Sequence, residues 1–254
     1  MDALRARPAA PAPRPTLNHL HHVPDPGTHT CASCNVRDAC AARGLAKDDA
    51  AGLFDIRFGQ QRVRAGHALY RAGDAFGAIY AVRAGFLKSS FALEDGRDQV
   101  TGFHMAGEIV GLDGMGTGLH CTDVRALEDS HVCVIPHKRL RDPALQPVLR
   151  KAMALELVRD QGAMLLLGTM SADERLAAFL LNLSQRFHAR GFASSDFHLR
   201  MTRDEIASYL GVKMETVSRL FSRFRDEGFI AVQQKHIRIL DADGLRAVMG
   251  RVTA

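Results

Sequence analysis

The sequence contains no tryptophan, and only 6% of its 254 residues are aromatic. A large aromatic cage for a ligand is therefore not expected. No apolar run reaches the ~18 residues that a membrane-spanning helix needs, and the first residues lead into proline and arginine rather than into a signal-peptide core. We therefore expect a cytoplasmic protein that does not enter a membrane.

Signatures of common enzyme classes are also missing. The chain has no Walker loop, no GxGxxG motif after a strand and no nucleophile elbow. We therefore expect no enzymatic activity. Hydrophobic residues make up 46% and charged residues 24% of the chain, which is typical of a globular protein. The net charge of +5 and the pI near 9.1 permit an anionic partner such as nucleic acid.

Residues 51–136 consist of short segments rich in Val, Ile, Phe and Tyr. Glycine-bearing turns divide these segments, at Gly66, Gly73, Gly85, Gly96 and Gly107. Turn signals spaced by about 8–12 residues are typical of an antiparallel barrel or sandwich. We predict a β-roll here.

Residues 143–170 contain few turn residues and carry apolar side chains at helical intervals. These side chains are Leu149, Met153, Leu157, Met164 and Leu167. Their spacing is typical of a coiled-coil seam, and it predicts a long helix that pairs with a second copy of the chain. Asp160 falls inside the seam. Two such carboxylates would meet where charge is disfavoured and would weaken the dimer. The alternative is that Asp160 lies on a solvated face.

The residues after Ser171 predict helices again. Ser171 to Glu174 is a capping-box signature for a helix that we expect to end at Leu183, and Thr202 to Glu205 repeats it. The second box opens a short helix that ends at Leu210-Gly211. A further helix over 213–226 and an alternating segment over 229–240 follow. This order predicts a helix-turn-helix with a β-wing.

The start of the helix over 213–226 has a spacing suited to reading DNA. Glu215, Ser218 and Arg219 stand at i, i+3 and i+4, so they share one face. Arginine can pair with guanine, glutamate can accept from cytosine, and serine can bond to several base edges. Lys213, Arg223 and Thr202 complete the predicted DNA-binding residues, with the cations on phosphates. Alternatively, Glu215 and Arg219 form only a surface ion pair.

The five cysteines are odd in number, and no export signal accompanies them, so a disulfide framework is not expected. Cys31, Cys34 and Cys40 lie within ten residues, close enough for one loop to wrap a metal centre. A fourth ligand must come from Cys121 or Cys133. Three clustered cysteines and a distant one suit an iron–sulfur cluster better than zinc, but spacing alone leaves both open.

Several motifs of this chain resemble those of the Crp/Fnr family of transcription regulators. The segment from Met201 to Arg219, with its Glu-x-x-Ser-Arg motif, resembles the helix-turn-helix of the oxygen-responsive FNR branch. The stretches Thr101 to His104 and Glu174 to Phe179 are similar as well. The resemblance extends from about Thr30 to the C-terminus.

The resemblance implies an oxygen-labile [4Fe-4S] cluster. Its ligands would be the three clustered cysteines and Cys133, since the family's last cysteine precedes an Ile-Pro pair, as Cys133 does. Cys121 would be a spare thiol. The family implies a dimer that binds double-stranded DNA at TTGAT-like half-sites while the cluster is intact, with Arg219 on guanine. Oxygen would convert the cluster to [2Fe-2S] and release the dimer. A zinc- or thiol-based redox regulator is the alternative.

The resemblance also carries expectations about other partners. Family members contact RNA polymerase through exposed β-roll loops such as that at residues 94–97, which could equally be a solvated turn. The cyclic-nucleotide branch holds a cyclic phosphate with an arginine beside a serine or threonine. Here Gly107-Glu108 is present, but the later stretch Leu119 to Thr122 has no arginine. We therefore expect no cyclic nucleotide.

Together these observations predict an α+β protein in four parts. Residues 1–30 form an arm, residues 31–142 a cluster-binding loop and β-roll sensor, residues 143–170 a dimerisation helix, and residues 171–254 a winged helix-turn-helix. The dimer-switch residues are Met153, Leu157, Asp160 and Met164.

Overall fold

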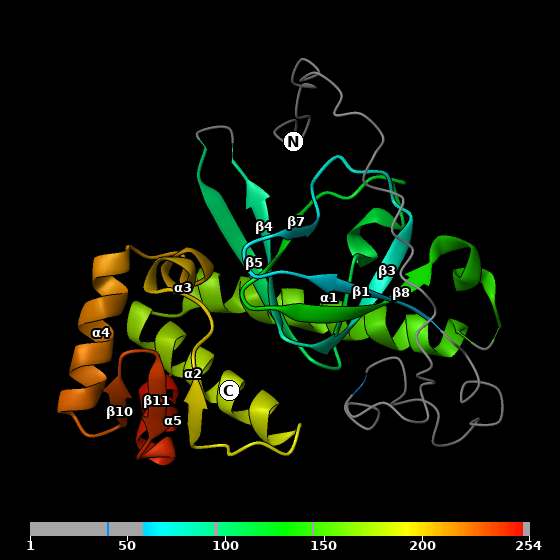
Figure 1. Ribbon diagram of the computed structural model, residues 1–254. Coiled ribbons are helices and arrows are strands. Elements are labelled where there is room, and N and C mark those ends of the chain that lie inside the picture. The colour runs from blue at the N-terminus through cyan, green and yellow to red at the C-terminus, as the bar shows by residue number, and fades with distance from the viewer. Residues whose placement is uncertain (1–39, 41–57, 94–95, 144, 251–254) are drawn as a thin grey trace.

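The computed structural model describes residues 40, 58–93, 96–143 and 145–250. The predicted arm, Cys31 and Cys34 lie outside the described residues. A β-rich part is followed by the long helix α1 and then by a helical part that contains a small sheet (Figure 1). The predicted α+β organisation is confirmed. Among the described residues, no helix is long and apolar enough to cross a membrane.

The β-rich part is the predicted β-roll, built from two antiparallel four-stranded sheets. The first sheet has the strand order β1-β8-β3-β6 and the second β2-β7-β4-β5. The strands are β1 (Gly59–Val63), β2 (Ala68–Tyr70), β3 (Ala78–Ala84), β4 (Phe86–Ala92), β5 (Asp98–Met105), β6 (Ile109–Val110), β7 (Asp123–Ala126) and β8 (Ser130–Pro136). Two short 3-10 helices, Leu112–Gly114 and His137–Arg141, follow β6 and β8.

Alternation along the strands places one side of each sheet in the interior of the roll. Val82, Leu87 and Val132, from three different strands, are almost completely buried there. Apolar side chains at every second position face inward because successive side chains of a strand point to opposite faces. The five glycines of the predicted turns all have positive φ, as tight turns often require.

The long helix predicted over residues 143–170 is α1 (Gln146–Thr169). Its first turns are anchored, because Leu149 and Ala152 pack with Leu145 and with residues of the first sheet. Beyond these turns much of its apolar surface is exposed. The helix thus connects the β-roll to the C-terminal part while leaving an apolar stripe uncovered.

The C-terminal part contains the predicted helix-turn-helix and wing. Its elements are α2 (Ala172–His188), β9 (Asp196–His198), α3 (Arg203–Leu210), α4 (Met214–Asp226), β10 (Ile230–Gln233), β11 (His236–Ile239) and α5 (Ala242–Met249). Both capping boxes are formed, at Ser171 and at Thr202. The expected end of α2 at Leu183 was wrong. The helix continues because Phe187 stacks on Phe197 of β9, with ring centroids 5.3 Å apart.

The second sheet of the β-roll and the C-terminal part share one hydrophobic core. Phe86, Val100, Phe103 and Met105 of the roll belong to the same buried cluster as the interior residues of α2, α3 and α4. The ring centroids of Phe103 and Phe179 lie 6.0 Å apart. The helix-turn-helix part is therefore packed directly against the β-roll.

Gly85, between β3 and β4, offers a test of the packing within the β-roll. Its φ is +93°, and an added Cβ would lie 2.7 Å from Ser130 Cα; Gly66 has φ +77° with nothing within 4 Å. Gly66→Ala should cost about 1–2 kcal/mol, since an L-residue is disfavoured in this conformation. Gly85→Ala should cost roughly 1–3 kcal/mol more, because backbone must move. Urea unfolding of both variants measures the difference, and equal losses would contradict the close contact.

Candidate functional site

The turn between α3 and α4 sets the position of the predicted recognition helix. Gly211 ends α3 in the left-handed conformation at φ 64°. The amide of Val212 then donates to Ala207 O at 3.0 Å. This closes the end of α3 as a glycine C-cap. At the other end, Thr202 Oγ1 accepts from the amide of Glu205 at 3.1 Å. Local capping thus fixes both ends of the first helix of the motif.

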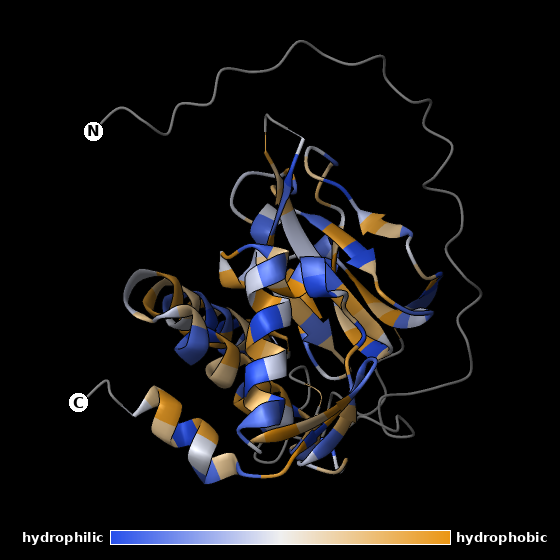
Figure 2. Cartoon of the chain, turned by 90° about the vertical axis from the view of Figure 1, so that its left-hand side faces the viewer, coloured by the Kyte–Doolittle hydropathy of each residue, from blue (hydrophilic) through white to orange (hydrophobic). Residues whose placement is uncertain are grey.

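Helix α4 has one buried and one exposed face. Val217, Leu220, Phe221 and Phe224 are buried, as expected from their spacing. Glu215, Ser218 and Arg219 are all exposed. In Figure 2, α4 stands at the front with many hydrophilic residues towards the viewer. Ser218 and Arg219 also line a surface hollow with Ser222, Arg223 and Asp226. The predicted base-reading residues therefore share one open face.

The predicted phosphate contacts are less uniform. Lys213 is exposed at the N-cap of α4. Arg223, by contrast, has Nη2 at 2.5 Å from Asp173 Oδ2 and Nε at 3.6 Å from Glu227 Oε1. The hydroxyl of Thr202 is engaged by Glu205 within the capping box. Lys213 is thus the cation more available to a phosphate, while the side chains of Arg223 and Thr202 already bond to carboxylates of the chain itself.

Arg203 is a cation near the recognition helix that the sequence analysis did not single out. Its guanidinium lies 3.3 Å from the ring centroid of Phe221, and burial lowers its pKa to about 10, so it stays charged at neutral pH. Among the described residues its Nη1 is one of the few buried side-chain atoms without a hydrogen-bond partner. Its position directly after the capping threonine could have drawn attention to it.

Two of the predicted cysteine ligands lie against the same part of the core. Cys40 and Cys133 are both half-buried and both pack against the cluster formed by residues of β3, β8 and the start of α1. Cys133 stands in the middle of β8, opposite Gln60 on one side and Ala81 on the other. The structure thus places two cysteines from distant parts of the chain against the same hydrophobic cluster.

Cys121 lies in a different environment. It is exposed, and its thiol donates to Asp113 Oδ2 at 3.6 Å. Partial burial and the neighbouring Asp113 carboxylate raise the pKa of this thiol. A raised pKa disfavours the thiolate, which is the form that binds metals. Of the two candidates for the fourth ligand, Cys133 therefore has the better surroundings.

Comparison with known proteins shows relatives along almost the whole chain. The transcriptional regulatory protein Btr of Bordetella pertussis is 42% identical over 231 residues, covering 89% of this chain and 96% of Btr. The fumarate and nitrate reduction regulatory protein of Salmonella typhimurium is 41% identical over 225 residues, covering 87% and 90%. A Crp-like helix-turn-helix domain matches residues 174–248, and a cyclic nucleotide-binding domain matches residues 60–144.

The chain belongs to the Crp/Fnr family of transcription regulators. These regulators are not enzymes, so the expected absence of catalysis agrees with the family. Among solved structures, FixK2 from Bradyrhizobium japonicum has a TM-score of 0.72 and 27% identity, covering 78% of this chain and 100% of FixK2. The β-roll and the helix-turn-helix are therefore the family's two domains.

A polar network in the β-roll is centred on Asp113. The Asp113 carboxylate accepts from the amides of Cys121 and Thr122 at 2.9 and 3.1 Å and from Thr122 Oγ1 at 3.0 Å. His120 Nδ1 lies 3.2 Å from Asp113 Oδ1. Burial opposes the charge of Asp113, but these bonds prevail and lower its pKa. The Asp113 carboxylate thus occupies the amide and hydroxyl donors of Cys121 and Thr122.

The predicted dimer seam of α1 lies open on the single chain. Met153, Leu157 and Met164 are 49%, 59% and 72% exposed. Asp160 is exposed on the same helix. Regulators of this family are generally dimeric. An exposed apolar stripe on a long helix is typical of a surface that contacts another protein chain. Leu149 differs, since it is buried against the β-roll and lies outside the open part of the seam.

Arg175 of α2 joins the end of α1 to the helix-turn-helix. Its guanidinium donates to Met170 O and Leu167 O at the end of α1, both at 2.9 Å, and to Leu210 O at the end of α3, at 2.8 Å. It belongs to the family-like stretch from Glu174 to Phe179, but its spacing alone gave no sign of this role. A single side chain therefore holds two helix ends together.

Proposed function

We propose that this protein is an oxygen-responsive transcription factor of the FNR type. Cys31, Cys34, Cys40 and Cys133 would hold a [4Fe-4S] cluster, and the protein would bind DNA as a homodimer at TTGAT-like half-sites while the cluster is intact. It would regulate genes of anaerobic or microaerobic metabolism from the cytoplasm. RNA polymerase would be its partner at promoters.

The observation that carries this proposal is the common location of Cys40 and Cys133. Both pack against the cluster that contains Leu145, Leu149 and Ala152 at the start of α1. Cysteine thiolates are the usual ligands of iron–sulfur clusters, so thiols at this place suit such a cluster. Relatives named for fumarate and nitrate reduction, and the activator Anr of Pseudomonas aeruginosa at 42% identity, support the same assignment.

The position of the cysteines suggests how DNA binding is controlled. A bound cluster supplies redox-sensitive bonds to these thiolates. Cys40 and Cys133 contact the apolar residues that anchor the first turns of α1, so a change in their positions alters the support of the helix. Farther along α1, Met153, Leu157 and Met164 would meet their counterparts, with Asp160 opposing close approach. The monomer–dimer balance is then sensitive to small changes.

The proposal assigns no cyclic nucleotide to the β-roll. An anionic phosphate would have to displace Asp113 from the amides of Cys121 and Thr122. It would find no arginine in the stretch from Leu119 to Thr122 to balance its charge. Glu108, which follows the glycine of the Gly107-Glu108 turn, is itself bound by Arg186 and Arg190.

Cysteine substitution tests the cluster. Anaerobically purified protein should contain iron and acid-labile sulfide, and Cys133→Ala should abolish the visible chromophore because one thiolate ligand is lost. The matched control Cys121→Ala should keep it, since that thiol lies beside Asp113. Zinc without sulfide in the unsubstituted protein would replace the cluster by a zinc- or thiol-based regulator. Loss of colour in Cys121→Ala alone would reverse the ligand choice.

Removing the seam carboxylate tests the switch. Asp160→Ala should sediment as a dimer in air and bind its DNA site there, because two carboxylates no longer meet in the seam. Asp243→Ala removes the same charge from an exposed site on α5, so it should stay monomeric in air. A monomeric Asp160→Ala protein would contradict the proposed role of Asp160.

Base discrimination tests the recognition helix. Arg219→Ala should remove discrimination at the guanine of the half-site, at roughly 1–3 kcal/mol, if Arg219 pairs with that base. Lys213→Ala should instead weaken binding to all sequences and reduce its salt dependence, as a phosphate contact does. Binding titrations on the half-site and on a guanine-substituted half-site measure both effects. Equal losses on the two sequences for Arg219→Ala would make it a phosphate contact.

A further inference from the structure

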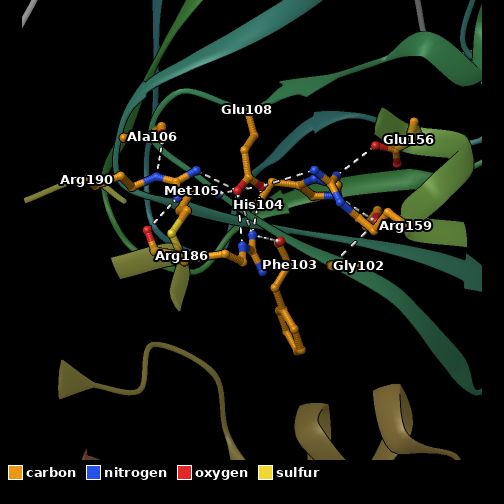
Figure 3. A network of polar contacts seen from close by, with 11 residues as sticks. Gly102, Phe103, His104, Met105, Ala106, Glu108, Glu156, Arg159, Arg186 and Arg190 are labelled. Atoms are coloured by element: carbon orange, nitrogen blue, oxygen red, sulfur yellow. Dashed lines mark hydrogen bonds and ion pairs between the residues drawn. The ribbon is translucent and has the colours of Figure 1, made fainter. Parts of the chain in front are cut away.

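A buried ion-pair cluster joins the β-roll to the two long helices. Its centre is Glu108, which is 8% exposed. Arg186 Nη2 donates to Glu108 Oε2 at 2.7 Å, and Arg190 Nη2 donates to Oε1 at 2.6 Å. Arg159 Nη2 of α1 lies 3.9 Å from Oε2. Figure 3 shows the three arginines converging on this one carboxylate. The β-roll, α1 and α2 therefore meet at one side chain.

Backbone hydrogen bonds fix the turn that carries Glu108. The turn that carries it is tied to β3, because Gly107 N donates to Val82 O and Val82 N donates to Glu108 O, both at 2.8 Å. The turn is also closed by the bond from Glu108 N to Met105 O at 3.1 Å. Glu108 is thus held by the backbone of the roll rather than by a loose loop.

The arginines bind the β-roll backbone as well as the carboxylate. Arg186 Nη2 donates to Phe103 O at 2.6 Å, and Arg190 Nε donates to Ala106 O at 2.5 Å. Arg190, which lies just after the end of α2, also donates from Nη1 to Arg186 O of that helix. Planar guanidinium groups with several acceptors fix direction as well as distance. The C-terminal half of α2 is therefore held against the β5–β6 turn in one orientation.

The charge balance of the cluster depends on Glu108. Burial opposes its ionisation, but Arg186, Arg159 and Arg190 lower its pKa, so it stays charged at neutral pH. Glu156 offsets Arg159, with 2.7 Å between Arg159 Nη1 and Glu156 Oε2. Neutralising Glu108 would leave buried guanidinium groups without their common counter-charge, which a folded protein tolerates poorly.

Helix α2 passes this orientation on to the recognition helix. Leu176 and Leu180 of α2 lie in the same buried cluster as Leu220 and Phe224 of α4. Interiors of this kind are close-packed, so α2 and α4 move together. Fixing α2 relative to the β-roll and α1 thus fixes where α4 points.

We propose that Glu108 is a positioning residue for DNA reading, which sets the angle of the helix-turn-helix relative to the dimer helix. The inference rests on the proposed dimeric binding to two half-sites. Two recognition helices read sites about 34 Å apart, one helical turn, only if both are held at the right angle. Glu108 thereby serves as the joint between the β-roll, α1 and α2.

Half-site spacing separates this role from general stabilisation. Binding of the anaerobic full-length protein is measured on a palindrome, on the same palindrome with one inserted base pair, and on a single half-site. Glu108→Gln should lose about 10- to 100-fold on the palindrome, because two linked modules lose avidity when their geometry is not held. It should also distinguish the two spacings less than the unsubstituted protein does. Binding to the single half-site should be unchanged, and the visible chromophore should persist.

Two further variants complete the test. Arg190→Gln removes the ion pair with Glu108 and the bonds to Ala106 O and Arg186 O, while the Arg186–Glu108 pair remains. It should therefore show a smaller change of the same kind, and it guards against misfolding of Glu108→Gln. Glu128→Gln breaks a half-exposed ion pair between the same two parts, in which Arg200 Nε lies 3.1 Å from Glu128 Oε2. It should bind all three DNAs as the unsubstituted protein does.

The outcomes are distinct. An unchanged spacing preference in Glu108→Gln and Arg190→Gln, or an equal loss on palindrome and single half-site, would overturn the positioning role. If the unsubstituted protein itself shows no preference for spacing, the proposed dimeric binding fails instead.

Discussion

The rest of the structure depends on α1, a single continuous helix whose start, middle and end make different contacts. Its first turns are buried with Cys40 and Cys133 against the β-roll, its middle exposes an apolar stripe, and its end is held by Arg175. A helix of 24 residues transmits displacement at one end to the other because its backbone bonds are internal. Arg175 also donates to Leu210 O at the end of α3. Helix α1 is therefore joined to the helix-turn-helix where the turn between α3 and α4 begins.

Two carboxylates organise the polar contacts of the β-roll. Asp113 takes up the amides of Cys121 and Thr122, and Glu108 takes up Arg186 and Arg190. Both carboxylates have lowered pKa values although burial opposes their charge, because the donors around them are numerous. These bonds hold the turns that carry the two carboxylates in one arrangement.

Local signals made the helix-turn-helix predictable from sequence, whereas long-range contacts were not. The capping boxes at Ser171 and Thr202, the C-cap at Gly211 and the apolar face of α4 each depend on residues within a few positions of one another. The Glu108 cluster joins residues 78 and 82 positions apart. No periodicity marks such a pair. The same holds for β9, which depends on pairing with β11, and for the extension of α2, which depends on Phe197.

The contact between the β-roll and the C-terminal part combines two kinds of interaction with different consequences. The shared core around Phe103 and Phe179 supplies most of the buried apolar surface, and apolar contacts are largely non-directional. Small rotations of one part over the other would cost such a core little if packing could readjust. The polar contacts do not allow this, since Glu108 and its arginines, and Ser208 with Val100 N at 2.9 Å, each require one geometry. Apolar burial therefore holds the two parts together, and the buried polar bonds select the angle at which they are held.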